Sequence, residues 1–227
     1  MERGIISPAF VKGADGVYRC VALEEMQWLE HGFTTRRSAS SIQEVTTLRQ
    51  IHSATVLSAA GLDDRACEGD ALISSERGKR IGVRSADCVP ILLADSETRT
   101  VAAIHAGWRG TAARIASKTV ERMQEDFGTQ PRNVIAAIGP SIGVCCYEVG
   151  SEVRARFADV FPELAGDGRV MLDLVEANRR ILRAAGVPVE QIHSSGLCTC
   201  CSADEFFSYR RDPGEPGRMI SFVGRLR

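Results

Sequence analysis

Three residues that can bind a transition metal, His52, Cys88 and His105, are spread along the first half of this 227-residue chain. Imidazole and thiolate groups are common zinc ligands, and three of them leave a fourth position open to water or substrate, which is typical of catalytic zinc. Their spacing matches no compact metal motif, so spacing alone favours a structural role for His52 and Cys88. The three residues form a site only if the fold brings them together.

Short apolar runs rich in β-branched residues predict the strands around Cys88 and His105. The predicted strands are Val83 to Ser85, Val89 to Ala94 and Val101 to His105. Residues 96–99, with their turn-forming side chains, predict a hairpin loop between the last two. His52 lies in the alternating run from Gln50 to Val56, which also predicts a strand.

The register of this hairpin decides whether Cys88 and His105 can meet. If Asp95 pairs with Thr100 across the loop, Pro90 lies opposite His105, and Cys88 points to the same face as Pro90. A slip of one residue would place Cys88 and His105 on opposite faces.

The segment from Ala106 to Thr111 joins the last of these strands to a predicted helix. Small residues, backbone N–H groups at a helix N-terminus and Arg109 would suit an anion such as phosphate. A tight turn with a solvated arginine is an equally good interpretation. The helix itself is predicted from apolar positions at spacings of three and four between Ala112 and Met123, with Gly128 as its C-terminal cap.

Further elements complete a mixed α/β pattern. A strand is predicted at Val134 to Ile138 and a helix at Ser151 to Phe161, and Asp173 with Glu176 resembles a capping box for a helix that closes at Gly186. Hairpins and helical connections together predict an α/β (α+β) protein with mixed sheets rather than an all-parallel one. No linker or repeat divides the chain, so a single domain over residues 1–227 is expected.

Composition narrows the function classes. The chain is 44% hydrophobic and 25% charged, with a net charge of -1, so no basic field favours nucleic acid or an anionic membrane. No apolar stretch approaches the roughly 18 to 20 residues of a membrane span, and no signal-like block follows the start. We therefore expect a cytoplasmic protein that acts on small molecules. The sequence makes no prediction of its oligomeric state.

The eight cysteines are read as thiols, metal ligands or a nucleophile, because nothing predicts export to an oxidising compartment. Cys145 and Cys146 are adjacent, and Cys198 and Cys201 have a C-x-x-C spacing. This spacing is weak support for zinc without a second regular pair. We interpret these cysteines as buried thiols or active-site lining, with a second metal as a minor alternative.

Eight strings, taken in order, resemble the YfiH-like family, also called laccase-domain or polyphenol oxidase proteins and regarded as purine nucleoside phosphorylases and deaminases. The matching strings are His31 to Arg36, Gln50 to His52, Gly69 to Leu72, Ser85 to Asp95, His105 to Thr111, Gly139 to Ile142, Cys145 to Val149 and Phe206 to Asp212. They cover nearly the whole chain. The resemblance implies a layered α/β/β/α sandwich and a catalytic zinc held by His52, Cys88 and His105.

The resemblance also implies a reaction: a purine nucleoside and phosphate would give the free base and ribose 1-phosphate. Adenosine deamination and methylthioadenosine phosphorolysis are additional activities to consider. Asp70 and Asp87 are candidate proton carriers. Arg36, Arg109 and Arg210 are candidates for binding phosphate, with Arg109 the best placed.

Other classes remain as alternatives. A cysteine hydrolase would use Cys88 as nucleophile and His105 as base, on an amide such as a cell-wall precursor. Copper-dependent phenol oxidation is less favoured, because an oxidase that reduces dioxygen to water needs several coppers and the chain has four histidines. A non-catalytic metal-binding module is the remaining alternative.

The segment between Arg36 and His52 differs from the family pattern. It has about a dozen residues where the family carries a longer stretch, and this length suits a bare connection. Whether it contributes to substrate binding is left open by the sequence.

Overall fold

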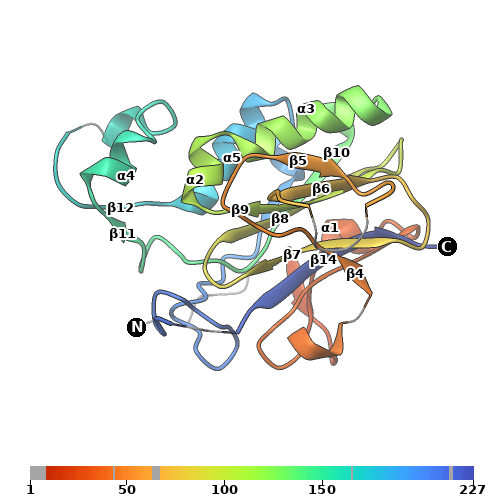
Figure 1. Ribbon diagram of the computed structural model, residues 1–227, viewed down its shortest axis with the longest axis horizontal. Coiled ribbons are helices and arrows are strands. Elements are labelled where there is room, and N and C mark those ends of the chain that lie inside the picture. Colours follow the sequence, from red (N-terminus) through yellow and green to blue (C-terminus); the bar gives the residue numbers. More distant parts are fainter. Residues whose placement is uncertain (1–8, 43, 63–66, 165, 215–216) are drawn as a thin grey trace.

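Two facing β-sheets and a layer of helices form the protein in the computed structural model, which describes residues 9–42, 44–62, 67–164, 166–214 and 217–227. Helices α3 (Ile115–Phe127) and α5 (Leu174–Ala184) cover the outer face of one sheet, and the second sheet packs on its other face (Figure 1). The predicted mixed α/β class is confirmed.

The helix-covered sheet has the strand order β13-β10-β8-β9-β6-β5. Its strands are β5 (Val56–Ser58), β6 (Ala71–Ser74), β8 (Val89–Asp95), β9 (Val101–Ala106), β10 (Val134–Ile138) and β13 (Ile192–Ser194). Parallel pairs at both edges (β5 with β6, β10 with β13) flank antiparallel pairs in the middle, so the sheet is mixed as predicted.

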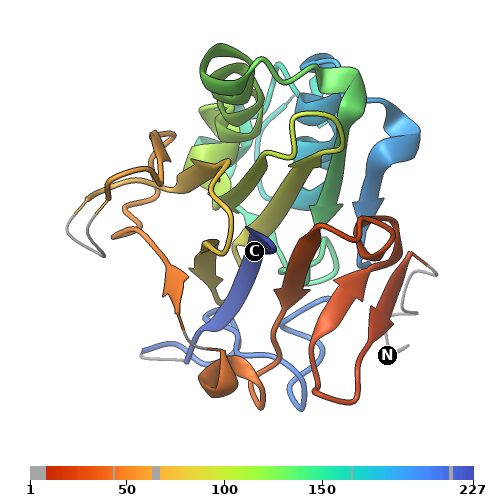
Figure 2. The same ribbon diagram turned by 90° about the vertical axis from the view of Figure 1, so that its right-hand side faces the viewer.

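The second sheet has the order β1-β2-β3-β14-β7-β4 (Figure 2). Its strands are β1 (Phe10–Lys12), β2 (Tyr18–Cys20), β3 (Leu29–Phe33), β4 (Val45–Thr46), β7 (Arg80–Ser85) and β14 (Met219–Arg225). The remaining elements are helices α1 (Val21–Glu24), α2 (Trp108–Ala112) and α4 (Ser151–Ala155), and the small pair β11 (Glu148–Val149) and β12 (Val170–Met171).

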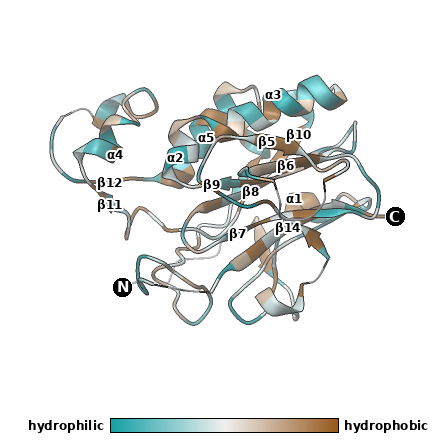
Figure 3. Ribbon diagram, viewed as in Figure 1, coloured by the Kyte–Doolittle hydropathy of each residue, from teal (hydrophilic) through white to brown (hydrophobic). Residues whose placement is uncertain are grey.

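Strand β8 is buried along its whole length because both of its faces are covered. Ile91 and Leu93 pack under the helices, whereas Leu92 and Ala94 pack against the second sheet. The hydropathy colouring shows the same layering, with hydrophobic central strands and a polar outer side on α3 (Figure 3). A strand buried on both sides reads as a continuous apolar run, as this one does.

The two sheets are linked by a short turn of residues 86–88, which leads from β7 in one sheet to β8 in the other. Pairing in the β8–β9 hairpin has Pro90 opposite His105, and the backbone N–H of Asp95 donates to the carbonyl of Thr100 at 3.0 Å. The predicted register is therefore confirmed, and it places Cys88 and His105 at the end of the space between the sheets.

Two predicted helices are shorter than expected. The helix expected to include Ala112 is broken into α2 and α3, because Arg114 between them adopts a left-handed conformation with φ of 61°. The helix predicted for Ser151 to Phe161 ends at Ala155 as α4, and turns follow it.

The segment after Arg36 is more than the bare connection expected from its length. It contains a 3-10 turn at Ala39–Ser41 and strand β4, which pairs in parallel with β7. Among the described residues, no helix is long and apolar enough to cross a membrane.

The predicted cap of α5 is confirmed and gives a stability test. The Asp173 carboxylate accepts the backbone N–H of Glu176 at 2.8 Å. Asp173→Ala leaves that N–H without its partner, so we expect the free energy of unfolding to fall by about 1 kcal/mol. Asp173→Asn keeps an acceptor and serves as the matched control. Urea denaturation of both variants checks this, and an equal loss in both would contradict the capping role.

A buried histidine predicts how stability changes with pH. Burial, together with the nearby Arg19, lowers the pKa of His31 from 6.5 to about 4, and its Nε2 accepts the N–H of Cys20 at 2.9 Å. The unfolded chain then binds a proton that the folded chain does not, so stability should fall as the pH drops from about 6.5 to about 4.

The test is urea denaturation across this pH range for the wild type and for His31→Gln, which does not titrate. We expect the variant to lose stability less steeply with acidification. Parallel curves for the two proteins would mean that His31 does not control this slope.

Candidate metal centre

The three candidate metal ligands converge in the structure. Their donor atoms, from His52, Cys88 and His105, all lie within 4.8 Å of one another. His105 is buried on β9, Cys88 is half-buried at the end of the 86–88 turn, and His52 is exposed. The rings of the two histidines meet edge to face, with centroids 5.0 Å apart.

His52 comes from a loop, so the strand predicted for Gln50 to Val56 is wrong over most of its length. Strand β5 begins only at Val56, and His52 itself has a left-handed backbone with φ of 59°. This conformation costs a non-glycine residue on the order of 1 kcal/mol and persists only where its surroundings enforce it.

Asp70 holds this loop in shape. One carboxylate oxygen accepts the backbone N–H of His52 at 3.0 Å, and the other accepts the N–H and the hydroxyl of Ser53 at 2.6 and 2.7 Å. Asp70 also bonds to Nδ1 of His105 at 2.9 Å. One buried carboxylate therefore orients two of the three ligands and leaves Nε2 of His105 for a metal, which is the arrangement found behind many metal-bound histidines.

The electrostatics of the site favour a charged cysteine. Burial raises the pKa of Cys88, but the hydrogen bonds and positive charge of His105 and His52 outweigh it and bring the pKa down to about 6. Burial likewise opposes protonation of His105, whereas Asp70 and Cys88 raise its pKa to about 9. The hydrogen bonds to His105 and Ser53 overcome burial of Asp70 and lower its pKa to about 2. The thiolate is the form of cysteine that binds metals.

A glycine leaves room beside the donor atoms. A Cβ atom at Gly107 would lie 3.0 Å from Sγ of Cys88 and 3.1 Å from Cδ2 of His52. Any other residue would press on both ligands. Two imidazoles and one thiolate that converge in this space fit a zinc-type ion with one open coordination position.

A cavity of about 710 Å³ opens in front of the three ligands. This volume is in the usual range for small-molecule sites. Four arginines, one aspartate and three large aromatic residues contribute to its wall; they are Arg84, Arg109, Arg210, Arg218, Asp87, Trp108, Tyr147 and Tyr209. The balance of charge along the wall is strongly positive.

The arginines predicted to bind phosphate divide into two groups. Arg109 and Arg210 both line the cavity, and each lies over an aromatic ring, Trp108 at 4.4 Å and Tyr147 at 5.2 Å. Arg36 is not part of the cavity wall; it donates to the carbonyl of Ala203 at 2.7 Å.

The second candidate proton carrier, Asp87, lies in the turn between the sheets and has φ of 92°. Its carboxylate accepts the hydroxyl of Thr199 at 2.6 Å, the hydroxyl of Ser208 at 3.1 Å and the N–H of Arg210 at 2.7 Å. Asp87 therefore ties two later segments of the chain to the wall of the cavity.

Several wall residues were not singled out as site residues from the sequence. Arg84 is the exposed position on β7, and Arg218 precedes β14; nothing in their local sequence indicates a site. Tyr147 lies within the string Cys145 to Val149 that carries the family resemblance, and this was the available signal. Leu48 and Gln50 show that the short segment before His52 also reaches the cavity.

Cys145, Cys146, Cys198 and Cys201 do not line the cavity, so their interpretation as active-site lining is wrong. Cys198 is buried, whereas Cys145 and Cys201 are exposed. They lie apart from Cys88 and form a group of their own.

Comparisons with known proteins identify the family of this chain. The model of the family described as "Multi-copper polyphenol oxidoreductase laccase" matches residues 30–226. A protein of Deinococcus radiodurans named purine nucleoside phosphorylase is 42% identical over 180 residues, 78% of this chain and 68% of that protein. A protein of an unknown prokaryotic organism named adenosine deaminase RL5 is 40% identical over 200 residues, 81% of this chain and 76% of that protein.

The aligned stretch covers 60% of the length of two further relatives named purine nucleoside phosphorylase, from Bacteroides thetaiotaomicron and Geobacillus stearothermophilus. The crystal structure of the Bacillus licheniformis protein YfiH superimposes with a TM-score of 0.87 at 28% identity, covering 97% of this chain and 100% of that one. With a family match over nearly its whole length and the same fold, the chain is an enzyme of the laccase-domain family to which YfiH belongs.

Proposed function

We propose that this enzyme is a zinc-dependent purine nucleoside phosphorylase, which converts inosine or adenosine and phosphate into the free base and ribose 1-phosphate. The observation that carries the proposal is the three-donor site of His52, Cys88 and His105, which opens into a cavity walled by four arginines. The names of the relatives from Deinococcus and Bacteroides support the same reaction.

The donor set favours zinc over a multi-copper cluster. Two of the four histidines of the chain belong to the site; His31 is buried in the second sheet and His193 lies on β13. A set of coppers that reduces dioxygen would need more imidazoles than this. A zinc ion bound here would supply a Lewis acid that polarises an oxygen of the substrate.

The cavity wall offers a substrate both guanidinium groups and aromatic rings, and Arg109 and Arg210 each lie over one of these rings. Guanidinium groups bind phosphate oxygens through paired hydrogen bonds, and Arg109 follows the metal ligand His105 by four residues in the chain. Trp108, Tyr147 and Tyr209 offer aromatic faces for a purine ring. Burial is the main cause that raises the pKa of Tyr147 to about 12, so its hydroxyl stays protonated and can donate a hydrogen bond.

Both carboxylates of the site are heavily engaged. Asp70 accepts from Ser53, His52 and His105, and Asp87 accepts from three further groups. This supports a positioning role for each in phosphorolysis. Their role as proton carriers, predicted from the sequence, stays a prediction.

Adenosine deamination is the second candidate activity. The relative named adenosine deaminase RL5 favours it, as does a metal site with an open position for water. Deamination needs no anion, so the arginines should distinguish the two reactions.

The first prediction concerns the metal ligands. Cys88→Ala removes one of three donors while shortening a half-buried side chain, so the variant should fold, lose about one equivalent of zinc and lose base release and deamination together. Elemental analysis, circular dichroism and chromatography of the products check this. Cys67→Ala is the control, because Cys67 is half-buried and belongs neither to the metal site nor to the group of Cys145, Cys146, Cys198 and Cys201. Full activity of metal-free Cys88→Ala would refute the metal-dependent reaction.

The second prediction separates phosphate binding from the metal. Arg109→Ala should raise the KM for phosphate about tenfold or more, because a charged hydrogen bond contributes about 1.5–3 kcal/mol, and should leave deamination less affected. Arg122→Ala, on the exposed side of α3, is the control. Products are separated with and without phosphate.

The proposed function fails if zinc-loaded wild-type protein releases no base from any common purine nucleoside. A cysteine hydrolase then becomes the leading alternative.

A further inference from the structure

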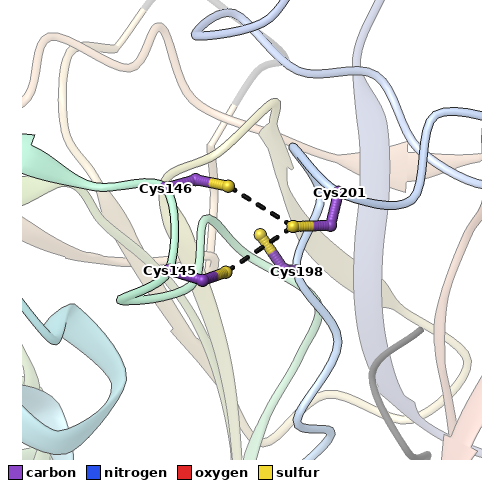
Figure 4. A group of neighbouring side chains, drawn as sticks. All are labelled: Cys145, Cys146, Cys198 and Cys201. Carbon is purple, nitrogen blue, oxygen red and sulfur yellow. Dashed lines mark hydrogen bonds between the residues drawn. The ribbon is translucent and has the colours of Figure 1, made fainter. Parts of the chain in front are cut away.

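Four cysteine sulfurs from two distant segments meet in one place outside the cavity. Cys145 and Cys146 follow strand β10, and Cys198 and Cys201 follow strand β13, its parallel neighbour in the sheet (Figure 4). All four Sγ atoms lie within 4.8 Å of one another. This group is called the four-cysteine cluster below.

The distances within the cluster distinguish two kinds of chemistry. Sγ of Cys201 lies 3.3 Å from that of Cys146 and 3.6 Å from that of Cys145 (Figure 4). A disulfide requires about 2.05 Å. Four sulfurs around a tetrahedral zinc ion, with Zn–S bonds of about 2.3 Å, lie roughly 3.8 Å from one another. The observed separations are near the second value.

The backbone at Gly143 makes close contacts with two of the sulfurs. The N–H of Gly143 donates to Sγ of Cys198 at 3.2 Å. A Cβ atom on Gly143 would lie 3.2 Å from Sγ of Cys145 and 3.4 Å from Sγ of Cys198, so a larger residue would press on both. Backbone N–H groups that point at cysteine sulfur stabilise the thiolate form.

Packing alone does not account for this arrangement. Cys145 and Cys201 are exposed, so burial of apolar surface gives them little reason to converge. Thiols form only weak hydrogen bonds with each other. Four soft donors within 4.8 Å of one another favour zinc or a similarly thiophilic ion, and a complete set of four protein ligands is typical of a structural site.

We propose that Cys145, Cys146, Cys198 and Cys201 form a second, structural zinc site, distinct from the site of His52, Cys88 and His105. The proposal rests on the geometry of the four sulfurs and is independent of the reaction proposed above.

The position of the cluster indicates that an ion there would stabilise the cavity wall. The loop that carries Cys145 and Cys146 also brings Ile142 and Tyr147 to the cavity wall. On the other segment, Thr199 donates to Asp87 in the turn between the sheets. A shared ion would lock these two segments together and so fix the wall that faces the substrate.

Metal content tests the proposal directly. Protein purified under reducing conditions with zinc should hold about two equivalents. The double variant Cys145→Ser/Cys201→Ser should hold about one, and so should Cys88→Ala, whereas Cys67→Ser should keep both. Zinc content that is the same in the double variant and the wild type would overturn the proposal. If Cys88→Ala loses zinc and the double variant does not, the site of His52, Cys88 and His105 is supported and the four-cysteine site is refuted.

A measurement on Cys88→Ala, which keeps all four cysteines of the cluster, covers the case in which the double variant does not fold. Cobalt(II) bound by four thiolates gives sulfur-to-metal charge-transfer bands that are much more intense than those of cobalt bound by two imidazoles and one thiolate, because the intensity rises with the number of thiolates. We expect the four-thiolate spectrum in Cys88→Ala loaded with cobalt, and protection of four thiols from a thiol reagent until a chelator is added. Absence of that spectrum, or a disulfide within the cluster of the reduced preparation, would refute the site.

Discussion

The buried carboxylate of Asp70 is the contact on which the candidate site depends. Its hydrogen bonds reach the loop at His52 and Ser53 and the ring of His105, so one ionised group fixes the left-handed backbone of His52 and the orientation of two ligands. These donors replace the water that the carboxylate loses on burial, which is why it can stay charged in the interior. The sheet supplies the frame, since Asp70 immediately precedes β6, the neighbour of β9.

The turn between the two sheets gives the site its second constraint. Cys88 stands where the chain crosses from β7 to β8, and its neighbour Asp87 accepts hydrogen bonds from Thr199, Ser208 and Arg210. Residues more than a hundred positions apart are therefore assembled around three consecutive turn residues. The metal ligand Cys88 and the cavity residue Arg210 are both held at this turn, and Thr199 links it to the segment that carries Cys198 and Cys201. The geometry of these parts therefore depends on the same packing of one sheet on the other.

The sequence was informative where local pattern decides structure. The β8–β9 hairpin and its register follow from apolar runs and turn residues, and this register is what brings Cys88 and His105 together. The cap at Asp173 follows from local chemistry in the same way. The loop at His52 could not be predicted, because its shape comes from Asp70, 18 residues away, which overrides an alternating pattern typical of a strand. Arg84 and Arg218 reach the cavity only through tertiary packing, and the cysteine cluster depends on the parallel pairing of β10 with β13.

Strand β14 occupies an interior position of the second sheet, between β3 and β7, although it is the last of the described strands along the chain (residues 219–225). During synthesis on the ribosome, β3 and β7 emerge long before the strand that joins them. Until then, the inner face of β8 lacks its complete cover, and its apolar residues are open to association with other chains. Chaperone binding to the nascent chain would be of most use in this interval, which ends only when the strand has cleared the exit tunnel.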